Sequence, residues 1–179
     1  QNNGFTSQML CATDAFVHPR SISVHTTANK AEDQNFYNWN IQWADYQPSG
    51  YWIPPFTLFN IWVIGDDIEG FVCIGTQGLA EKRDRSKQTE NMLELALTKG
   101  QNLFTSGPNG GALHFRNNGS TNFRVLLGPQ TEPIPYFVLG QTPPDDWHRM
   151  LKESDPMTQV ELVGNHVVIA AYADTYRRY

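Results

Sequence analysis

The feature that most constrains this chain is a series of short apolar runs separated by turn residues, which begins near Tyr51 and continues almost to the end. This rhythm is typical of an all-β sandwich, in which short strands alternate with tight turns. The predicted strands are Phe56–Ile64, Phe71–Ile74, Met92–Thr98, Ala112–Arg116, Asn122–Leu127, Tyr136–Leu139 and Val167–Tyr172. We therefore expect a mainly β chain that forms an antiparallel β-sandwich with one or two short helices.

Alternation within two of these runs predicts which side chains face the core. The alternating sets are Leu93, Leu95 and Leu97 in one run, and Phe123, Val125 and Leu127 in another. Successive side chains of a strand point to opposite faces, so each set shares one face, which should point inward. The run from Phe59 to Ile64 is apolar except at Asn60. That run predicts a central strand covered on both sides.

Glycine and asparagine between the runs supply the turns, since both residues accept a positive φ. The predicted turns are Gly65-Asp66-Asp67, Gly100-Gln101-Asn102, Gly107-Pro108-Asn109-Gly110-Gly111 and Asn117-Asn118-Gly119. Each of them should separate two neighbouring strands.

Two stretches have helical rather than strand character. Apolar residues of the window 36–43 recur at the spacing of an amphipathic helix, which Pro48-Ser49-Gly50 should end. A second helix is predicted to start at Thr142, whose hydroxyl can cap it and which is followed by two prolines and Asp145. We expect a polar, partly helical segment over residues 1–47 that packs on the sandwich, and a β-sandwich domain over residues 48–179.

The charge balance narrows the range of partners. The formal net charge is -5 and the isoelectric point is near 5.4, and the basic residues form only short clusters such as residues 82–87. Such a chain lacks the cationic surface that binds phosphates, so nucleic acid is not expected as a partner. No apolar run approaches the roughly 20 residues that cross a bilayer, so no membrane span is expected. The start at Gln1, without methionine or an apolar signal segment, indicates a processed or trimmed end.

The histidines and the acidic residues are the candidate metal ligands of this chain. A zinc hydrolase commonly takes two ligands from a His pair four residues apart on one helix, with Glu as the base. No such pair occurs among the five histidines, which are His18, His25, His114, His148 and His166. We therefore predict no catalytic residue and no zinc site in this chain. The acidic turn with Asp66, Asp67 and Glu69 is a candidate calcium site. The alternative is that these carboxylates simply belong to a solvated hairpin turn.

The chain has two cysteines, Cys11 and Cys73. A single disulfide between them is compatible with the composition, but their wide separation in sequence leaves the pairing open.

Aromatic residues near the start of the β region are candidates for binding a glycan. Trp39, Trp43, Tyr51 and Trp52 lie among asparagines and glutamines, so rings for stacking on sugars and amides for hydrogen bonding occur together. The alternative is that these rings pack a helix onto the sandwich, which is the more common use of such residues. Solvent exposure distinguishes the two interpretations.

A family resemblance extends from about Pro48 to Tyr172. Its motifs, in chain order, are Pro48-Ser49-Gly50-Tyr51-Trp52 with the strand Leu58–Val63, Ile74-Gly75, Leu97-Thr98-Lys99-Gly100-Gln101-Asn102, Gly110-Gly111-Ala112-Leu113-His114-Phe115, Pro135-Tyr136-Phe137-Val138-Leu139-Gly140-Gln141-Thr142 with Trp147, and Val160-Glu161-Leu162-Val163-Gly164. Together they resemble the amino-terminal portion of enhancin-like zinc metallopeptidases, peptidase family M60, although Ser49 stands where a threonine is expected.

The resemblance implies a β-sandwich that precedes a catalytic region, in which a His-Glu-x-x-His helix binds zinc. It implies a secreted or cell-surface parent enzyme that cleaves glycoproteins or mucins. Because that helix is not found in this sequence, no catalytic residue is carried over to any position here. The expectation is a non-catalytic scaffold that positions substrate, with no cofactor of its own and with the parent's catalytic region as its partner.

Two other functions remain open at this point. A free-standing glycan-binding module would use the same sandwich and the aromatic residues near Trp43 and Trp52. An adaptor for a host surface or a protein partner would instead use the polar first part of the chain.

Overall fold

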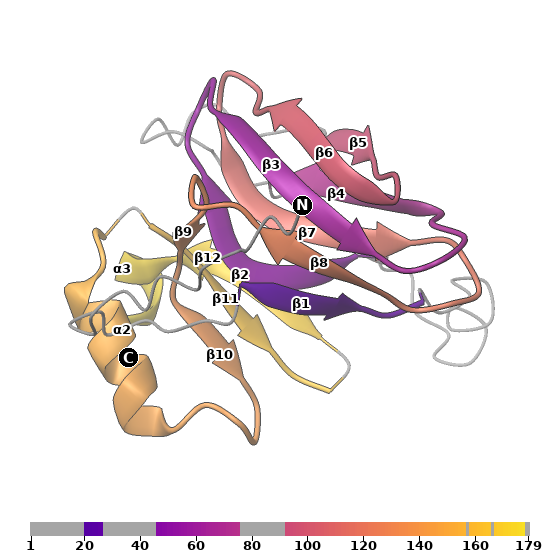
Figure 1. Cartoon of the computed structure of the whole chain (residues 1–179). Helices are drawn as coiled ribbons and strands as arrows, with labels where there is room; N and C mark the ends of the chain where they lie inside the picture. The colour runs from indigo at the N-terminus through magenta and orange to yellow at the C-terminus, as the bar shows by residue number, and fades with distance from the viewer. Residues whose placement is uncertain (1–19, 27–45, 76–91, 157, 166, 178–179) are drawn as a thin grey trace, which may run out of the picture.

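Three β-sheets and two helices make up the described part of the protein. The computed structural model describes residues 20–26, 46–75, 92–156, 158–165 and 167–177. Two of the sheets face each other and the third lies to one side with the helices (Figure 1). All strand pairs of the two facing sheets are antiparallel. The predicted mainly β fold with an antiparallel sandwich is confirmed.

The first layer of the sandwich is a four-stranded sheet. Its strands, in spatial order, are β1 (Ser21–Val24), β8 (Phe123–Leu127), β3 (Leu58–Ile64) and β6 (Gly100–Thr105). The side chains of Phe123, Val125 and Leu127 are buried, as their alternation predicts. Residues of β3 alternate in the same way, and the odd-numbered ones point into the core.

The second layer is a five-stranded sheet in the order β5 (Leu93–Ala96), β4 (Gly70–Ile74), β7 (Gly111–Asn117), β2 (Gln47–Ile53) and β9 (Glu132–Pro133). β7 is at its centre, and six of its seven residues are buried. Leu113 and Phe115 belong to the core between the layers. Burial of the residues between them means that the other face of β7 is covered as well.

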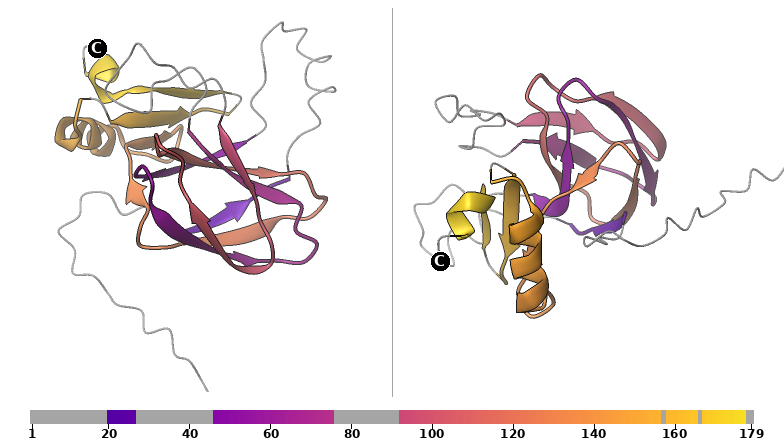
Figure 2. Two further views of the ribbon diagram at one scale, coloured as in Figure 1. Left: turned by 90° about the horizontal axis from the view of Figure 1, so that it is seen from above. Right: turned by 90° about the vertical axis from the view of Figure 1, so that its left-hand side faces the viewer.

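The third sheet starts a separate unit after the sandwich. It has the order β10 (Tyr136–Val138), β11 (Gln159–Val163) and β12 (Val168–Tyr172). β10 and β11 are parallel, so the chain must cross over between them, which it does through α2 (Pro144–Glu153). The short helix α3 (Ala173–Tyr176) follows β12. Figure 2 shows this C-terminal unit, which comprises β10–β12, α2 and α3, beside the sandwich.

The helix predicted from Thr142 is present as α2, but the predicted cap is wrong. Pro143 occupies the N-cap position and no side chain caps the helix. The Thr142 hydroxyl instead accepts a hydrogen bond from the backbone N–H of Val138 at 2.9 Å. The hydroxyl thus closes the turn between β10 and the helix.

The predicted double coverage of residues 59–64 is wrong in one respect. β3 is a central strand, paired with β6 and β8. Only Phe59, Ile61 and Val63 are buried, whereas Trp62 is 44% exposed and Ile64 38% exposed. Its outer face has no covering layer among the described residues. The strand alternates like the others, and its outward positions simply carry apolar residues.

The predicted turn at Gly100-Gln101-Asn102 is also wrong, because these residues begin β6. The turn lies just before them. The Asn102 side chain accepts a hydrogen bond from the N–H of Thr98 at 2.8 Å and donates one to the Thr98 carbonyl at 2.7 Å. Gly100 has a φ of 89°, which a residue without Cβ tolerates. The side chain of Asn102, not its backbone, shapes the turn.

Leu93 departs from the predicted inward face of its strand. Leu97 is 4% exposed, but Leu93 is 37% exposed. Its strand, β5, is at the edge of the five-stranded sheet, where the opposite layer gives less cover. Five of the described strands were not predicted as strands at all: β1, β2, β6, β9 and β11.

The expected division between residues 47 and 48 remains a prediction. Residues 21–24, which it places in the N-terminal segment, form β1 and pair with β8 of the sandwich. The window 36–43, predicted to be helical, lies outside the described residues. Among the helices that the structure describes, none has the length and apolar character needed to cross a membrane.

Candidate functional site

The most distinctive polar site is a buried histidine and glutamate between the sandwich and the C-terminal unit. Leu113 and Phe115 of β7 point into the sandwich core, so His114 between them points to the opposite face. There it meets Glu161 of β11, with the imidazole Nε2 2.7 Å from the carboxylate Oε1. The two side chains are 3% and 0% exposed. Strands far apart in the sequence are thus joined by one buried polar contact.

A bulge in β2 supplies a further partner for the glutamate. The pairing of β2 with β7 shifts register between Pro48 and Trp52, which is the signature of a β-bulge. Within it Gly50 has a φ of 73°, and its N–H donates a hydrogen bond to Glu161 Oε2 at 3.2 Å. The segment Pro48-Ser49-Gly50, expected to end a helix, instead redirects a strand so that its backbone contacts the carboxylate.

Tyr136 of β10 lies beside this cluster. It is level with Glu161 in the parallel register. A Cβ added at Gly50 would lie 2.9 Å from the Tyr136 ring, so the ring packs directly on the glycine. Burial, reinforced by the nearby Glu161 carboxylate, raises the pKa of Tyr136 to about 12. Its hydroxyl therefore stays protonated at physiological pH.

Hydrogen bonding of the histidine is incomplete. The Tyr46 ring stands edge-on to His114 at a centroid distance of 5.1 Å. Among the described residues Nδ1 has no hydrogen-bond partner, and Oε1 of Glu161 lacks hydrogen-bond geometry despite its short distance to Nε2. A carboxylate taken out of water is stable only when its surroundings compensate it. The imidazole and the Gly50 N–H provide that compensation, so the cluster acts as a junction between the two units.

The described residues do not assemble a zinc site. A zinc site takes three or four protein ligands, whereas His114 and Glu161 supply two. No group of three or more His, Cys, Asp or Glu side chains in the described ranges has the geometry to hold a metal ion. His18 and His166 lie outside those ranges.

The calcium candidate is an exposed turn after β3. Asp66 pairs with Lys99 at 2.5 Å. The hydrogen bond from Lys99, followed by its charge, lowers the pKa of Asp66. Asp67 has a φ of 50°, as expected of a residue in a tight turn. One carboxylate of the turn is therefore already neutralised by a side chain of the protein, and calcium binding there remains a prediction.

The glycan candidates are divided between described and undescribed parts of the chain. Trp39 and Trp43 lie outside the described residues. Tyr51 is 2% exposed, and the Arg20 guanidinium lies 5.5 Å from its ring centroid. Burial raises the pKa of Tyr51, while Arg20 acts in the opposite direction. Trp52 is half-buried. Of these four residues, Trp52 alone is described with accessible surface.

The cysteine pairing also remains a prediction. Cys73 is buried in β4 and lies opposite His114 in the register with β7. Cys11 lies outside the described residues.

Sequence reasoning missed the role of Glu161. It named Glu161 only within a motif of the family resemblance, and it named His114 only within another such motif and as one of the five histidines. One signal was available: each is a lone ionisable residue inside an apolar run. Two such residues in two buried strands are candidates to pair with each other.

These features define a class of protein: a β-sandwich domain joined through a buried polar junction to a smaller unit with a three-stranded sheet. Residues 28–132 match the N-terminal domain of M60-like peptidases. That match covers more than half of the chain, and the chain belongs to this family. A comparison with curated proteins found no match.

Several solved structures share the fold. A functionally unknown conserved protein from Bacillus anthracis str. Ames, in a mutant form, is similar with a TM-score of 0.72 and 23% identity, over 89% of this chain and 31% of its own. The catalytic module of the metalloprotease ZmpA from Clostridium perfringens is similar with a TM-score of 0.70 and 14% identity, over 90% of this chain and 36% of its own.

A third similar structure carries a glycan. The M60 catalytic domain of ZmpC from Clostridium perfringens, in complex with the sialyl T antigen, has a TM-score of 0.66 and 16% identity, over 88% of this chain and 35% of its own. The chain thus spans about a third of the length of these three solved structures. At these identities the likeness shows the fold alone.

Proposed function

We propose that this chain is a non-catalytic N-terminal scaffold that positions the catalytic region and the substrate of a secreted or cell-surface M60-like zinc metallopeptidase. Its membership of the M60-like N-terminal family supports the proposal, as does its likeness to about a third of a structure described as the catalytic module of a metalloprotease. The proposed substrates are glycoproteins or mucins, since one similar structure holds a glycan antigen. The proposed partner is the catalytic region of the same peptidase, which would carry the zinc.

The observation that carries the scaffold role is the junction at Glu161. A scaffold must hold its parts in a fixed geometry, because a small misplacement of substrate relative to catalytic groups is costly to the rate. Glu161 contacts β7 through His114 and β2 through Gly50. Both contacts are buried, so water does not compete for them. The C-terminal unit is therefore held to the sandwich from two strands at once.

The experiment compares the chain alone with the chain joined to an M60-like catalytic region. Each protein is incubated with a mucin-type glycoprotein and zinc, and cleavage is followed by gel electrophoresis and mass spectrometry. We expect cleavage only by the joined protein, and slower cleavage when Glu161 is replaced by Ala. Zinc-dependent cleavage by the chain alone would overturn the proposal.

A second candidate function is a carbohydrate-binding module. The half-buried Trp52 favours it, because a partly exposed indole can stack on a sugar ring. A glycan array with the chain and with Trp52→Ala tests this function. Binding that Trp52→Ala abolishes would support the module, whereas equal binding by both proteins would exclude Trp52 from the site.

A further inference from the structure

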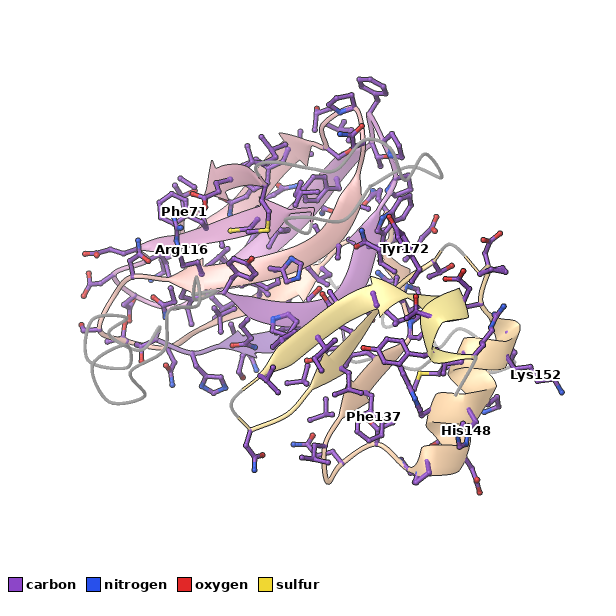
Figure 3. All side chains as sticks on the ribbon, turned by 180° about the vertical axis from the view of Figure 1, so that it is seen from behind. Phe71, Arg116, Phe137, His148, Lys152 and Tyr172 are labelled. Atoms are coloured by element: carbon purple, nitrogen blue, oxygen red, sulfur yellow. The ribbon has the colours of Figure 1, made fainter. Side chains whose placement is uncertain are left out.

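A cavity lies between the two helices of the C-terminal unit. Its volume is about 590 Å³, and its lining residues are Trp147, His148, Leu151, Lys152, Tyr176 and Arg177. The helix α2, which provides four of them, lies on the side of the unit remote from the sandwich (Figure 3). Small-ligand sites in proteins have volumes of roughly 300–1,000 Å³. The cavity is therefore large enough for one or two sugar rings.

The lining of the cavity is cationic although the whole chain is acidic. Its described residues include the cations Lys152 and Arg177 together with His148, and no carboxylate, whereas the chain has a net charge of -5. Arg177 is already engaged, since its guanidinium donates hydrogen bonds to the carbonyls of Leu151 and Ser154. Lys152 is not engaged: no side chain or carbonyl of the described residues pairs with its ammonium.

Lys152 and His148 form one recognition edge. They are four residues apart on α2, a spacing that places two side chains on the same face of a helix. Both are exposed, and Figure 3 shows both on this helix. A carboxylate placed between them could accept a charge-assisted hydrogen bond from the ammonium and another hydrogen bond from the imidazole.

Two aromatic residues, Trp147 and Tyr176, also line the cavity. The Trp147 ring makes edge-to-face contacts with Phe137 at 5.6 Å and with Tyr176 at 5.7 Å, so its orientation is fixed from two sides. The hydroxyl of Tyr176 is buried and has no hydrogen-bond partner among the described residues. Burial also raises the pKa of Tyr176. An unpartnered buried hydroxyl is costly, but this one is closed to solvent, so the cavity offers a ligand the aromatic rings and not this hydroxyl.

We infer that this cavity binds the carboxylate-bearing sugar of an acidic glycan. A bare inorganic anion has no apolar surface to pack on the aromatic rings. The centre of a protein–protein interface is usually depleted of charged residues, which does not match this lining. A sugar acid combines the two features that this lining can recognise: a carboxylate for Lys152 and His148, and a ring with apolar C–H faces that can pack on Trp147. The inference rests on the proposed substrate-positioning role, which it extends to a glycan class and a site.

The test is a titration of the 179-residue chain with 3′-sialyllactose, followed by two-dimensional NMR. Lactose, inorganic phosphate, AMP and a glutamate-rich peptide are the comparison ligands. We expect changes in the amide chemical shifts of residues 147–152 and 176–177 on addition of sialyllactose, and no such changes on addition of lactose. Lys152→Gln should weaken binding at least about tenfold, because a charge-assisted hydrogen bond is lost.

Arg149→Gln is the matched control, since it removes one positive charge from the same helix without touching the cavity lining. Arg149 pairs with Asp146 at 2.7 Å, and its replacement should leave the affinity within about twofold, as expected for a screened exposed charge. Absence of binding, or an equal response to lactose, would overturn the inference. Tighter binding of phosphate, AMP or the peptide would overturn the assignment to a glycan. Cleavage of a glycoprotein by the same sample would overturn the proposed function and leave the binding result intact.

Discussion

Replacement of Glu161 by Ala should be among the most destabilising single changes in the C-terminal unit. The side chain is fully buried, and its removal leaves the His114 imidazole without the carboxylate beside it and the Gly50 N–H without its acceptor. Breaking a buried pair by removing one partner costs about 3 to 5 kcal/mol. For a chain of this size, 1 kcal/mol corresponds to about 2 to 4 °C, so the melting temperature should fall by about 6 to 20 °C.

Chemical unfolding by urea, followed by circular dichroism and by tryptophan fluorescence, measures this free energy. Glu161→Gln should cost less than Glu161→Ala, because the amide oxygen still accepts the bond from Gly50. His114→Leu should also destabilise, since it leaves a buried carboxylate unpaired. The double variant His114→Leu with Glu161→Leu should cost less than the sum of the single changes by about 1 to 3 kcal/mol.

The matched control is Glu132→Gln, which removes an exposed carboxylate from β9. Its free energy of unfolding should stay within about 0.5 kcal/mol of that of the parent protein. If Glu161→Ala were as mild as this control, or if the His114 and Glu161 substitutions were additive, the junction would contribute no coupling and our reasoning would be refuted.

Three further changes test other parts of the structure. The raised pKa of Tyr136 means that folding favours the neutral phenol. Its contribution to the free energy of unfolding is therefore complete below pH 10 and is lost as the pH rises toward about 12. In urea titrations at different pH values, the decrease in the free energy of unfolding at alkaline pH should be about 2 to 3 kcal/mol smaller for Tyr136→Phe than for the parent protein. Gly50→Ala places a Cβ 2.9 Å from the Tyr136 ring, whereas Gly140→Ala meets nothing within 4 Å at a similar φ; calorimetry should show Gly50→Ala to be the more destabilising by at least about 1 kcal/mol. Asn102→Ala removes the hydrogen bonds to Thr98 and should lower the free energy of unfolding in urea by about 1 to 3 kcal/mol. Gln101→Ala, which removes an exposed side chain, should lower it by less than about 0.5 kcal/mol. Equal effects of the two substitutions would show that the Asn102 side chain does not shape the turn.

The sequence predicted the strands that have a clear apolar rhythm. Residues 123–127 alternate strictly, and their strand was assigned with the correct inward face. The strands β2 and β6 were not predicted, for a different reason. Pro48, Gly50 and Gly100 are usually signs of chain reversal, but here a bulge and a turn closed by Asn102 place them in strands. Such tertiary compensation is invisible to local propensity.

The candidate site was less accessible to sequence reasoning than the fold. Both His114 and Glu161 stand in apolar runs, which signals burial but does not name the partner. Their pairing depends on the crossover from β10 through α2 to β11, which brings β11 against β7 and β2. The separation of β2 and β11 along the sequence does not indicate that the two strands are in contact. Local patterns predict which residues are buried more readily than which buried residues meet.

The central claim is that the sandwich and the C-terminal unit form one rigid scaffold held at Glu161. Native-state hydrogen exchange tests it most directly, because it measures the opening free energy of each strand separately. The account predicts that the amides of β11 are protected to the same opening free energy as those of β7, and that both fall together in Glu161→Ala. Exchange of β11 through an opening several kcal/mol easier than that of β7 in the unaltered protein would contradict it.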